Sequence, residues 1–203
     1  QGDVGCGKTV VAAAAVLAAI EGGQQAVVMA PTELLAEQHL RVFSGWFEKV
    51  GIKPVWLSGR ISQRERRAVC DQLSTGAARV VVGTHAVFQD DVSYYNLGLV
   101  VVDEQHRFGV AQRLALREKG QREGSAPHQI IMSATPIPRS LTMVMYADMD
   151  LSVIDEMPPG RQPVETVVLP NTRREDVQAR IREAGARERR ADWVCPLIDD
   201  SDV

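Results

Sequence analysis

The chain has little cysteine, and its three cysteines lack the spacings of disulfide or zinc sites. Cys6, Cys70 and Cys195 lie far apart, and the chain contains no C-x-x-C and no Cys/His pair at zinc spacing. Free thiols of this kind are typical of proteins in a reducing compartment. We therefore expect a cytoplasmic protein.

Long apolar runs, an excess of positive charge, internal repeats and low-complexity tracts are also absent. The apolar stretch from Val10 to Ile20 is far shorter than the ~20 residues that span a bilayer, and it has no basic leader or signal-peptide cleavage site. We expect no membrane contact. A formal net charge of −3 excludes a strongly cationic surface, so any contact with nucleic acid must come from local groups and backbone amides.

The chain does contain a complete phosphate-binding loop, and it lies at the start. Gly2 to Thr9 reads G-D-V-G-C-G-K-T, which matches G-x-x-x-x-G-K-[ST]. In this motif Lys8 supplies charge to the β/γ-phosphates and Thr9 supplies a hydroxyl to Mg²⁺. Gly2 and Gly7 are expected where a Cβ would clash, so that backbone N–H groups can face the phosphates. The nucleotide site is therefore predicted to comprise Gly2, Asp3, Val4, Gly5, Cys6, Gly7, Lys8 and Thr9.

Apolar strands alternate with amphipathic helices over most of the chain. Strands are expected at 26–30, 55–57, 79–83, 97–103 and 129–132, and helices at 10–20, 32–51, 62–73, 110–119 and 140–146. This alternation predicts an α/β fold with a mainly parallel sheet and helices on both faces. Polar motifs follow the strands, so the site should lie at the carboxyl ends of the strands.

The pattern breaks at the sequence M-P-P-G-R, residues 157–161, because two prolines and a glycine cannot lie inside a helix or a central strand. We predict one domain over residues 1–150, a linker over 151–163 and the start of a second domain over 164–203. The last part should hold a strand at 164–169, a helix at 173–187 and an apolar run at 193–198. These elements cannot bury a core alone, and no strand precedes the phosphate loop, so we expect a fragment of a larger protein.

Two carboxylates, Asp103 and Glu104, follow directly after a predicted strand. Adjacent residues at a strand end project in different directions, so the two groups can divide the work. We expect Asp103 to hold Mg²⁺, and Glu104 to orient and deprotonate the attacking water.

Five motifs occur in the order found in superfamily 2 helicases, which the chain resembles. They are the phosphate loop, A-P-T-E at 30–33, G-T-H-A at 83–86, D-E-Q-H at 103–106 and S-A-T-P at 133–136. Within that superfamily the chain resembles the RecG family through D-E-Q-H-R-F-G-V at 103–110, A-T-P-I-P-R at 134–139 and S-V-I-D-E-M-P-P-G-R at 152–161.

The resemblance implies a monomeric two-domain motor that binds ATP and Mg²⁺ between RecA-like domains and remodels forked or branched DNA in recombination and repair. Lys8, Asp103 and Glu104 would be catalytic, with Thr9 and Asp103 holding Mg²⁺. Gln105 and His106 would link the γ-phosphate to the coupling residues Ser133 and Thr135. The DNA track would consist of Pro31, Thr32, Glu33, Gly83, Thr84 and His85.

Other interpretations remain open at this point. A transcription-repair coupling factor has the same motor motifs, and a phosphate-loop kinase or a nucleotide-binding module without turnover would also use Gly2 to Thr9. His39 is expected to be a satisfied core or surface histidine. Arg60, Arg64, Arg66 and Arg67 could contact phosphate, but as a run of charges they are expected to form a solvated helix face.

Overall fold

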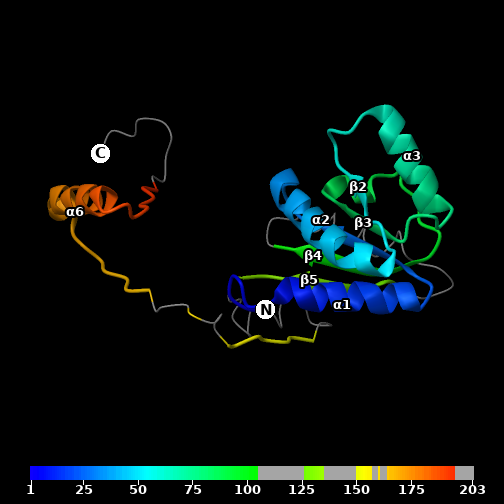
Figure 1. The fold of residues 1–203 in the computed structure, drawn as a ribbon, viewed down its shortest axis with the longest axis horizontal. Helices are drawn as coiled ribbons and strands as arrows, with labels where there is room; N and C mark the ends of the chain where they lie inside the picture. The colour runs from blue at the N-terminus through cyan, green and yellow to red at the C-terminus, as the bar shows by residue number, and fades with distance from the viewer. Residues whose placement is uncertain (105–125, 135–149, 157–159, 161–163, 195–203) are drawn as a thin grey trace. The chain divides into compact units, whose positions relative to one another are not determined.

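The computed structural model describes residues 1–104, 126–134, 150–156, 160 and 164–194 (Figure 1). The chain divides into two units, Gln1–Pro159 and Gly160–Val203. The helices expected at 110–119 and 140–146 lie outside the described residues.

Five strands of the first unit form one sheet. They are β1 (Gln25–Met29), β2 (Val55–Leu57), β3 (Val80–Gly83), β4 (Leu97–Asp103) and β5 (His128–Met132), in the order β2-β3-β1-β4-β5. All four neighbouring pairs are parallel. The predicted parallel sheet is confirmed. The carboxyl ends of its strands lie together along one side, here called the sheet edge.

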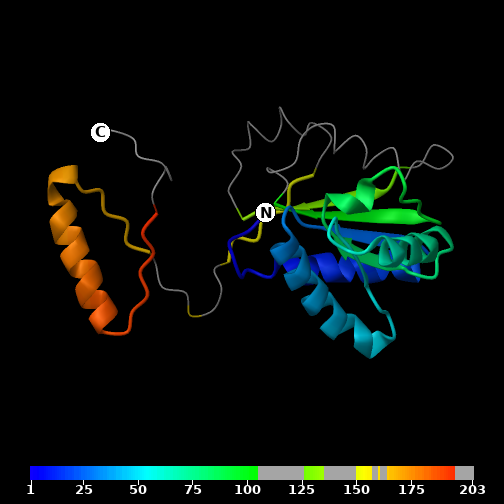
Figure 2. The ribbon, with the colours of Figure 1, turned by 90° about the horizontal axis from the view of Figure 1, so that it is seen from above.

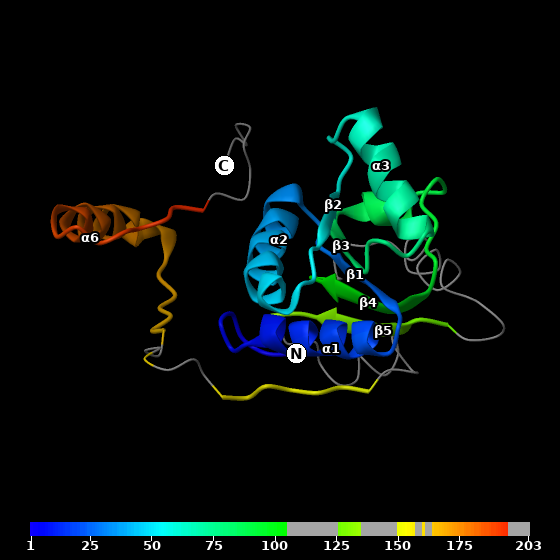
Figure 3. The same ribbon diagram turned by 45° about the vertical axis from the view of Figure 1, so that its right-hand side comes forward.

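Helices cover both faces of this sheet, as its strand composition requires. Alternate residues of β1 enter different cores: Val28 packs with residues of α1 (Lys8–Glu21) and α2 (Glu33–Phe47), whereas Val27 packs with Leu73 of α3 (Gln63–Ser74). Side chains that alternate across a strand must be apolar on both faces when both faces are buried. Figures 1 and 3 show α3 beside β2 and β3, and Figure 2 shows α1 running alongside the strands.

Local caps fix the starts of the helices that follow β1 and β2. The Thr32 hydroxyl accepts a hydrogen bond from the Leu35 N–H at the start of α2. Ser62 and Glu65 form a capping box at the start of α3, as their S-x-x-E spacing predicts. After α2 the chain forms a short 3-10 helix, η1 (Glu48–Val50), and a second one, η2 (His85–Phe88), follows β3.

The described part of the second unit contains the predicted helix but not the predicted strand. The short 3-10 helix η4 (Asn171–Arg173) leads into α6 (Arg174–Ala186), and the Arg174 guanidinium lies 5.6 Å from the ring centroid of Trp193. The strand prediction for 164–169 was wrong: the described chain there has no strand, and none of the described strands pairs with it. An extended apolar segment becomes a strand only when a neighbour supplies ladder hydrogen bonds.

In the part of the chain described here, no helix is both long enough and apolar enough to cross a membrane.

Candidate nucleotide-binding site

The phosphate loop connects the sheet edge to α1 through two glycines with left-handed backbones. Gly5 has φ 84° and Gly7, which precedes α1, has φ 97°. Residues with a Cβ seldom adopt such angles. Gly2 is required for another reason: a Cβ there would lie 2.5 Å from Cys6 Sγ and 3.0 Å from Ile154 Cβ. The prediction of a clash therefore holds for Gly2, whereas Gly7 has open space and is needed for its φ angle.

The Lys8 ammonium is held over this loop. Its Nζ donates hydrogen bonds to the main-chain oxygens of Gly2 and Asp3, at 2.6 and 2.8 Å. The first N–H groups of a helix have no acceptor inside the helix, so those of Lys8 and Thr9 are available to an anion at the start of α1. The loop thus presents a positive charge and a helix N-terminus to the same small volume.

Main-chain hydrogen bonds hold the start of the phosphate loop beside β5. The Gly2 N–H donates to the Ser133 oxygen at 3.2 Å, and the Ile154 N–H donates to the Gln1 oxygen at 2.8 Å. Gly2 and Ile154 form a parallel bridge. Ser133 is buried at the end of β5, and its main chain fixes where the phosphate loop begins.

Glu104 connects the acidic pair to the segment after β5. Its N–H donates to the Met132 oxygen at 2.9 Å, and its Oε1 accepts from the Ala134 N–H at 3.3 Å. Glu104 has φ 50°, a left-handed conformation that costs a non-glycine residue about 1–2 kcal/mol. Strained residues of this kind cluster at functional sites. Glu104 therefore links the D-E motif to the S-A-T-P motif through its hydrogen bond with Ala134.

Asp103 has a partner that the sequence motifs did not indicate. The Nε2 atom of His39, on α2, lies 2.7 Å from Asp103 Oδ2, and the two side chains are 11% and 15% exposed. His39 is a satisfied histidine, as expected, but the group that satisfies it belongs to the candidate site. These residues are 64 positions apart, so only the fold brings them together.

The residues assigned to the DNA track after β1 have local partners. Thr32 caps α2, although its hydroxyl keeps its own proton to donate. The Glu33 carboxylate lies 3.0 Å from Arg60 Nε, and the Arg60 side chain is 87% exposed. Arg60 thus places an exposed guanidinium beside the start of α2.

The residues assigned to the track after β3 differ in their surroundings. A Cβ on Gly83 would lie 1.9 Å from the Leu57 oxygen, so Gly83 permits the close approach of β2. Thr84 is buried and its N–H donates to that same oxygen at 3.3 Å, whereas His85 is exposed. Among these three, His85 is the exposed side chain at the edge.

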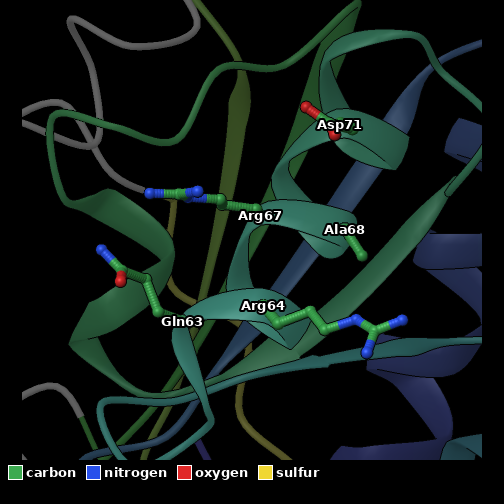
Figure 4. Close-up of a pocket in the computed structure, with 5 residues that line it drawn as sticks. All are labelled: Gln63, Arg64, Arg67, Ala68 and Asp71. Carbon is green, nitrogen blue, oxygen red and sulfur yellow. The ribbon is translucent and has the colours of Figure 1, made fainter.

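The arginines of α3 do not form one uniform solvated face. Arg66 makes two hydrogen bonds to Asp91, of 2.6 and 2.7 Å, which raise the pKa of its guanidinium. Arg64 and Arg67 are exposed, as expected, and extend to opposite sides of the helix (Figure 4). They line a shallow hollow on α3 together with Gln63, Ala68 and Asp71.

The sheet edge fits a nucleotide with a divalent ion. The glycine backbone, Lys8 and the start of α1 suit phosphate oxygens, and the Asp103 carboxylate suits Mg²⁺. Magnesium in such sites takes one or two carboxylates and completes its shell with phosphate and water. Among the residues that the structure describes, no cluster of three His, Cys, Asp or Glu side chains could bind a metal alone. Gln105, His106 and Thr135 lie outside the described residues.

Comparison with known proteins identifies the family. A family model for the DEAD/DEAH box helicases matches residues 1–144. ATP-dependent DNA helicase RecG of Haemophilus influenzae is 55% identical over 204 residues, which cover all of this chain and 29% of that protein. RecG of Escherichia coli (strain K12) is 56% identical with the same coverage.

A solved structure of RecG bound to a three-way DNA junction is similar in fold and sequence. It has a TM-score of 0.76 and 42% identity, and the similarity covers 92% of this chain and 24% of that one. This chain spans 29% of the length of the two curated relatives. It belongs to the DEAD/DEAH box helicase family, and the relatives that it resembles over its whole length are RecG helicases.

Proposed function

We propose that this chain is the ATP-binding part of a DNA helicase that couples ATP hydrolysis to the remodelling of forked or branched DNA. The observation that carries the proposal is the hydrogen-bonded junction of the phosphate loop, Glu104 and the Ser133–Ala134 segment at one sheet edge. In a phosphate-loop kinase the segment after β5, which Glu104 contacts here, would have no role. The two relatives and the solved structure above are RecG proteins, so a coupling factor is not favoured either.

In this proposal the loop residues bind the ATP phosphates and the acidic pair completes the site. Lys8 neutralises charge on the β/γ-phosphates, while Thr9 and Asp103 hold Mg²⁺. The ion, when bound, offsets the negative charge that develops on the transferred phosphoryl group. Glu104 orients a water molecule for in-line attack and accepts its proton.

The coupling between ATP and DNA is assigned to the segments that meet this site. Glu104 already contacts the Ala134 N–H, so a shift of its carboxylate during hydrolysis would also displace Ser133 and the residues after it. We propose that Gln105 and His106 link the γ-phosphate to the coupling residues Ser133 and Thr135.

The DNA track is proposed to lie along the loops after β1 and β3. Pro31, Thr32, Glu33, Gly83, Thr84 and His85 belong to these loops, where hydroxyl and main-chain N–H groups reach phosphate oxygens. The carboxylate of Glu33 would repel a phosphate by itself. Its ion pair with the exposed Arg60 supports the addition of Arg60 to the track, with Glu33 holding the guanidinium in place.

The larger protein is proposed to be a cytoplasmic, monomeric motor that acts in DNA recombination and repair. Residues 151–163 would link the first RecA-like domain to the second, of which 164–203 would form the start. An arginine from the second domain would complete the ATP site, so the chain alone should turn ATP over poorly.

The proposal is tested by ATP hydrolysis and junction unwinding in the full-length protein. Lys8→Ala should weaken ATP binding, and Glu104→Gln should retain ATP but lose DNA-stimulated hydrolysis by roughly 10²-fold or more, because the general base is removed. Both variants should fail to unwind a three-way junction. Intact DNA-stimulated hydrolysis in either variant would refute the site.

A further inference from the structure

The proposed role of Asp103 sets the direction of its contact with His39. A magnesium ligand is an ionised carboxylate, which has only acceptor sites, so in that state the proton in the 2.7 Å contact belongs to His39 Nε2. Both side chains are largely withdrawn from water, at 11% and 15% exposure. Hydrogen bonds to a charged group are stronger than neutral ones, and a local dielectric below that of water strengthens them further.

The surroundings of His39 hold its ring in one place. The ring meets Phe43, one helical turn later on α2, edge to face with centroids 6.2 Å apart. Phe43 is itself fully buried between α2 and the sheet. The imidazole is therefore fixed by packing on one side, while its Nε2 reaches the carboxylate on the other.

The backbone of Asp103 is fixed separately. Asp103 ends β4 and is paired in register with Met132 of the parallel strand β5. A strand fixes the direction in which the side chain leaves, but rotation about its own bonds is left free. The bond to His39 removes that freedom by engaging Oδ2, so that Oδ1 keeps its lone pairs for another ligand.

We infer that His39 is a positioning residue for the magnesium ligand Asp103. The inference rests on the proposed function, in which Asp103 holds the Mg²⁺ of ATP. A carboxylate whose orientation is already set binds an ion without first losing rotational freedom, so His39 raises the affinity of the site for Mg²⁺. Partners of this kind behind a metal ligand typically contribute 10–100-fold in metal affinity or activity.

The test measures Mg²⁺ dependence in the full-length protein with His39→Gln, His39→Asn and His39→Ala. Gln can place an amide N–H near the position of Nε2, whereas the shorter Asn cannot, although both are polar amides. The matched control is His128→Gln, because His128 is exposed at the amino end of β5 and belongs to no proposed site. Asp103→Asn serves as the reference for loss of the ligand itself.

Two readouts separate metal binding from folding and from turnover. The first is the affinity for a fluorescent ADP analogue with and without Mg²⁺, and the second is the Mg²⁺ concentration that half-saturates ATP hydrolysis. We expect Ala and Asn to raise the half-saturating Mg²⁺ roughly 10-fold and to lose the Mg²⁺-dependent gain in ADP affinity. Affinity without Mg²⁺ should be unchanged, Gln should recover most of the effect, and His128→Gln should match the wild type.

The outcomes distinguish the inference from the function on which it rests. If Asp103→Asn shifts the Mg²⁺ dependence but His39→Ala and His39→Asn stay within about two-fold of wild type, the inference is wrong and the function stands. Equal effects of Gln and Asn would also overturn it, and this pair decides the matter if the Ala variant does not fold. If Asp103→Asn has no effect on Mg²⁺ dependence, the proposed role of Asp103 fails, and the inference fails with it.

Discussion

Gly83→Ala should loosen the pairing of β2 and β3. The new Cβ would lie 1.9 Å from the Leu57 oxygen and 3.0 Å from Val87 Cγ1. Carbon and oxygen seldom approach closer than about 3.3 Å, so the Leu57 carbonyl must move by more than ~1 Å. That carbonyl accepts the Thr84 N–H. Overpacking costs about 1–3 kcal/mol and the weakened hydrogen bond about 1 kcal/mol more. We therefore expect the local stability of β2 and β3 to fall by ~2–4 kcal/mol.

Hydrogen–deuterium exchange of the full-length protein measures this loss, because it reports on each element separately. Peptides from β2 and β3 should exchange faster in Gly83→Ala. The control is Gly45→Ala: Gly45 lies in α2, and a Cβ there meets nothing within 4 Å. That variant should be more stable by about 0.5–1 kcal/mol, because alanine favours the helix.

Measuring DNA binding of the same variant beside its hydrogen exchange separates a packing role of Gly83 from a direct DNA contact. If Gly83→Ala weakened binding to branched DNA while β2 and β3 exchanged at the wild-type rate, the close-packing account would be refuted and a direct DNA contact favoured. Loss of both together would show that the effect on DNA follows from displacement of the loop after β3.

Three further predictions follow from described contacts. Gln25→Ala should lower stability by about 2–4 kcal/mol in urea or thermal unfolding, because buried Gln25 donates to two main-chain oxygens and accepts from the Asn96 N–H; an unchanged midpoint would contradict this. Arg60→Ala should reduce by about 1 the slope of log affinity against log salt for a DNA junction, measured by fluorescence anisotropy. An identical slope would remove Arg60 from the track. Ser62→Ala should cost about 1 kcal/mol and speed amide exchange in the first turn of α3, since the capping box with Glu65 is lost; wild-type protection there would be the contrary result.

Features that depend on neighbours in the chain could be predicted from the sequence. The phosphate loop, the cap at Thr32 and the capping box at Ser62 and Glu65 each involve residues within a few positions, so residue type and spacing determine them. The apolar runs of β1, β3 and β4 indicated strands buried on both faces, and the parallel sheet followed from their alternation with helices.

Features that depend on distant partners could not be predicted. His39 meets Asp103 because α2 packs on the sheet, and Glu104 reaches the Ala134 N–H because the parallel strands β4 and β5 end side by side. The need for glycine at position 83 likewise comes from the approach of β2. The segment 164–169 shows the opposite case, since an apolar pattern alone did not make a strand.

The fate of the γ-phosphate of ATP tests the central claim most directly. The full-length protein would be incubated with γ-labelled ATP and Mg²⁺, with and without a three-way DNA junction, and the labelled products separated. The account predicts that the label appears as inorganic phosphate, and that it appears faster when the junction is present. Release at the same rate with and without the junction, or transfer of the label to a small acceptor, would contradict it.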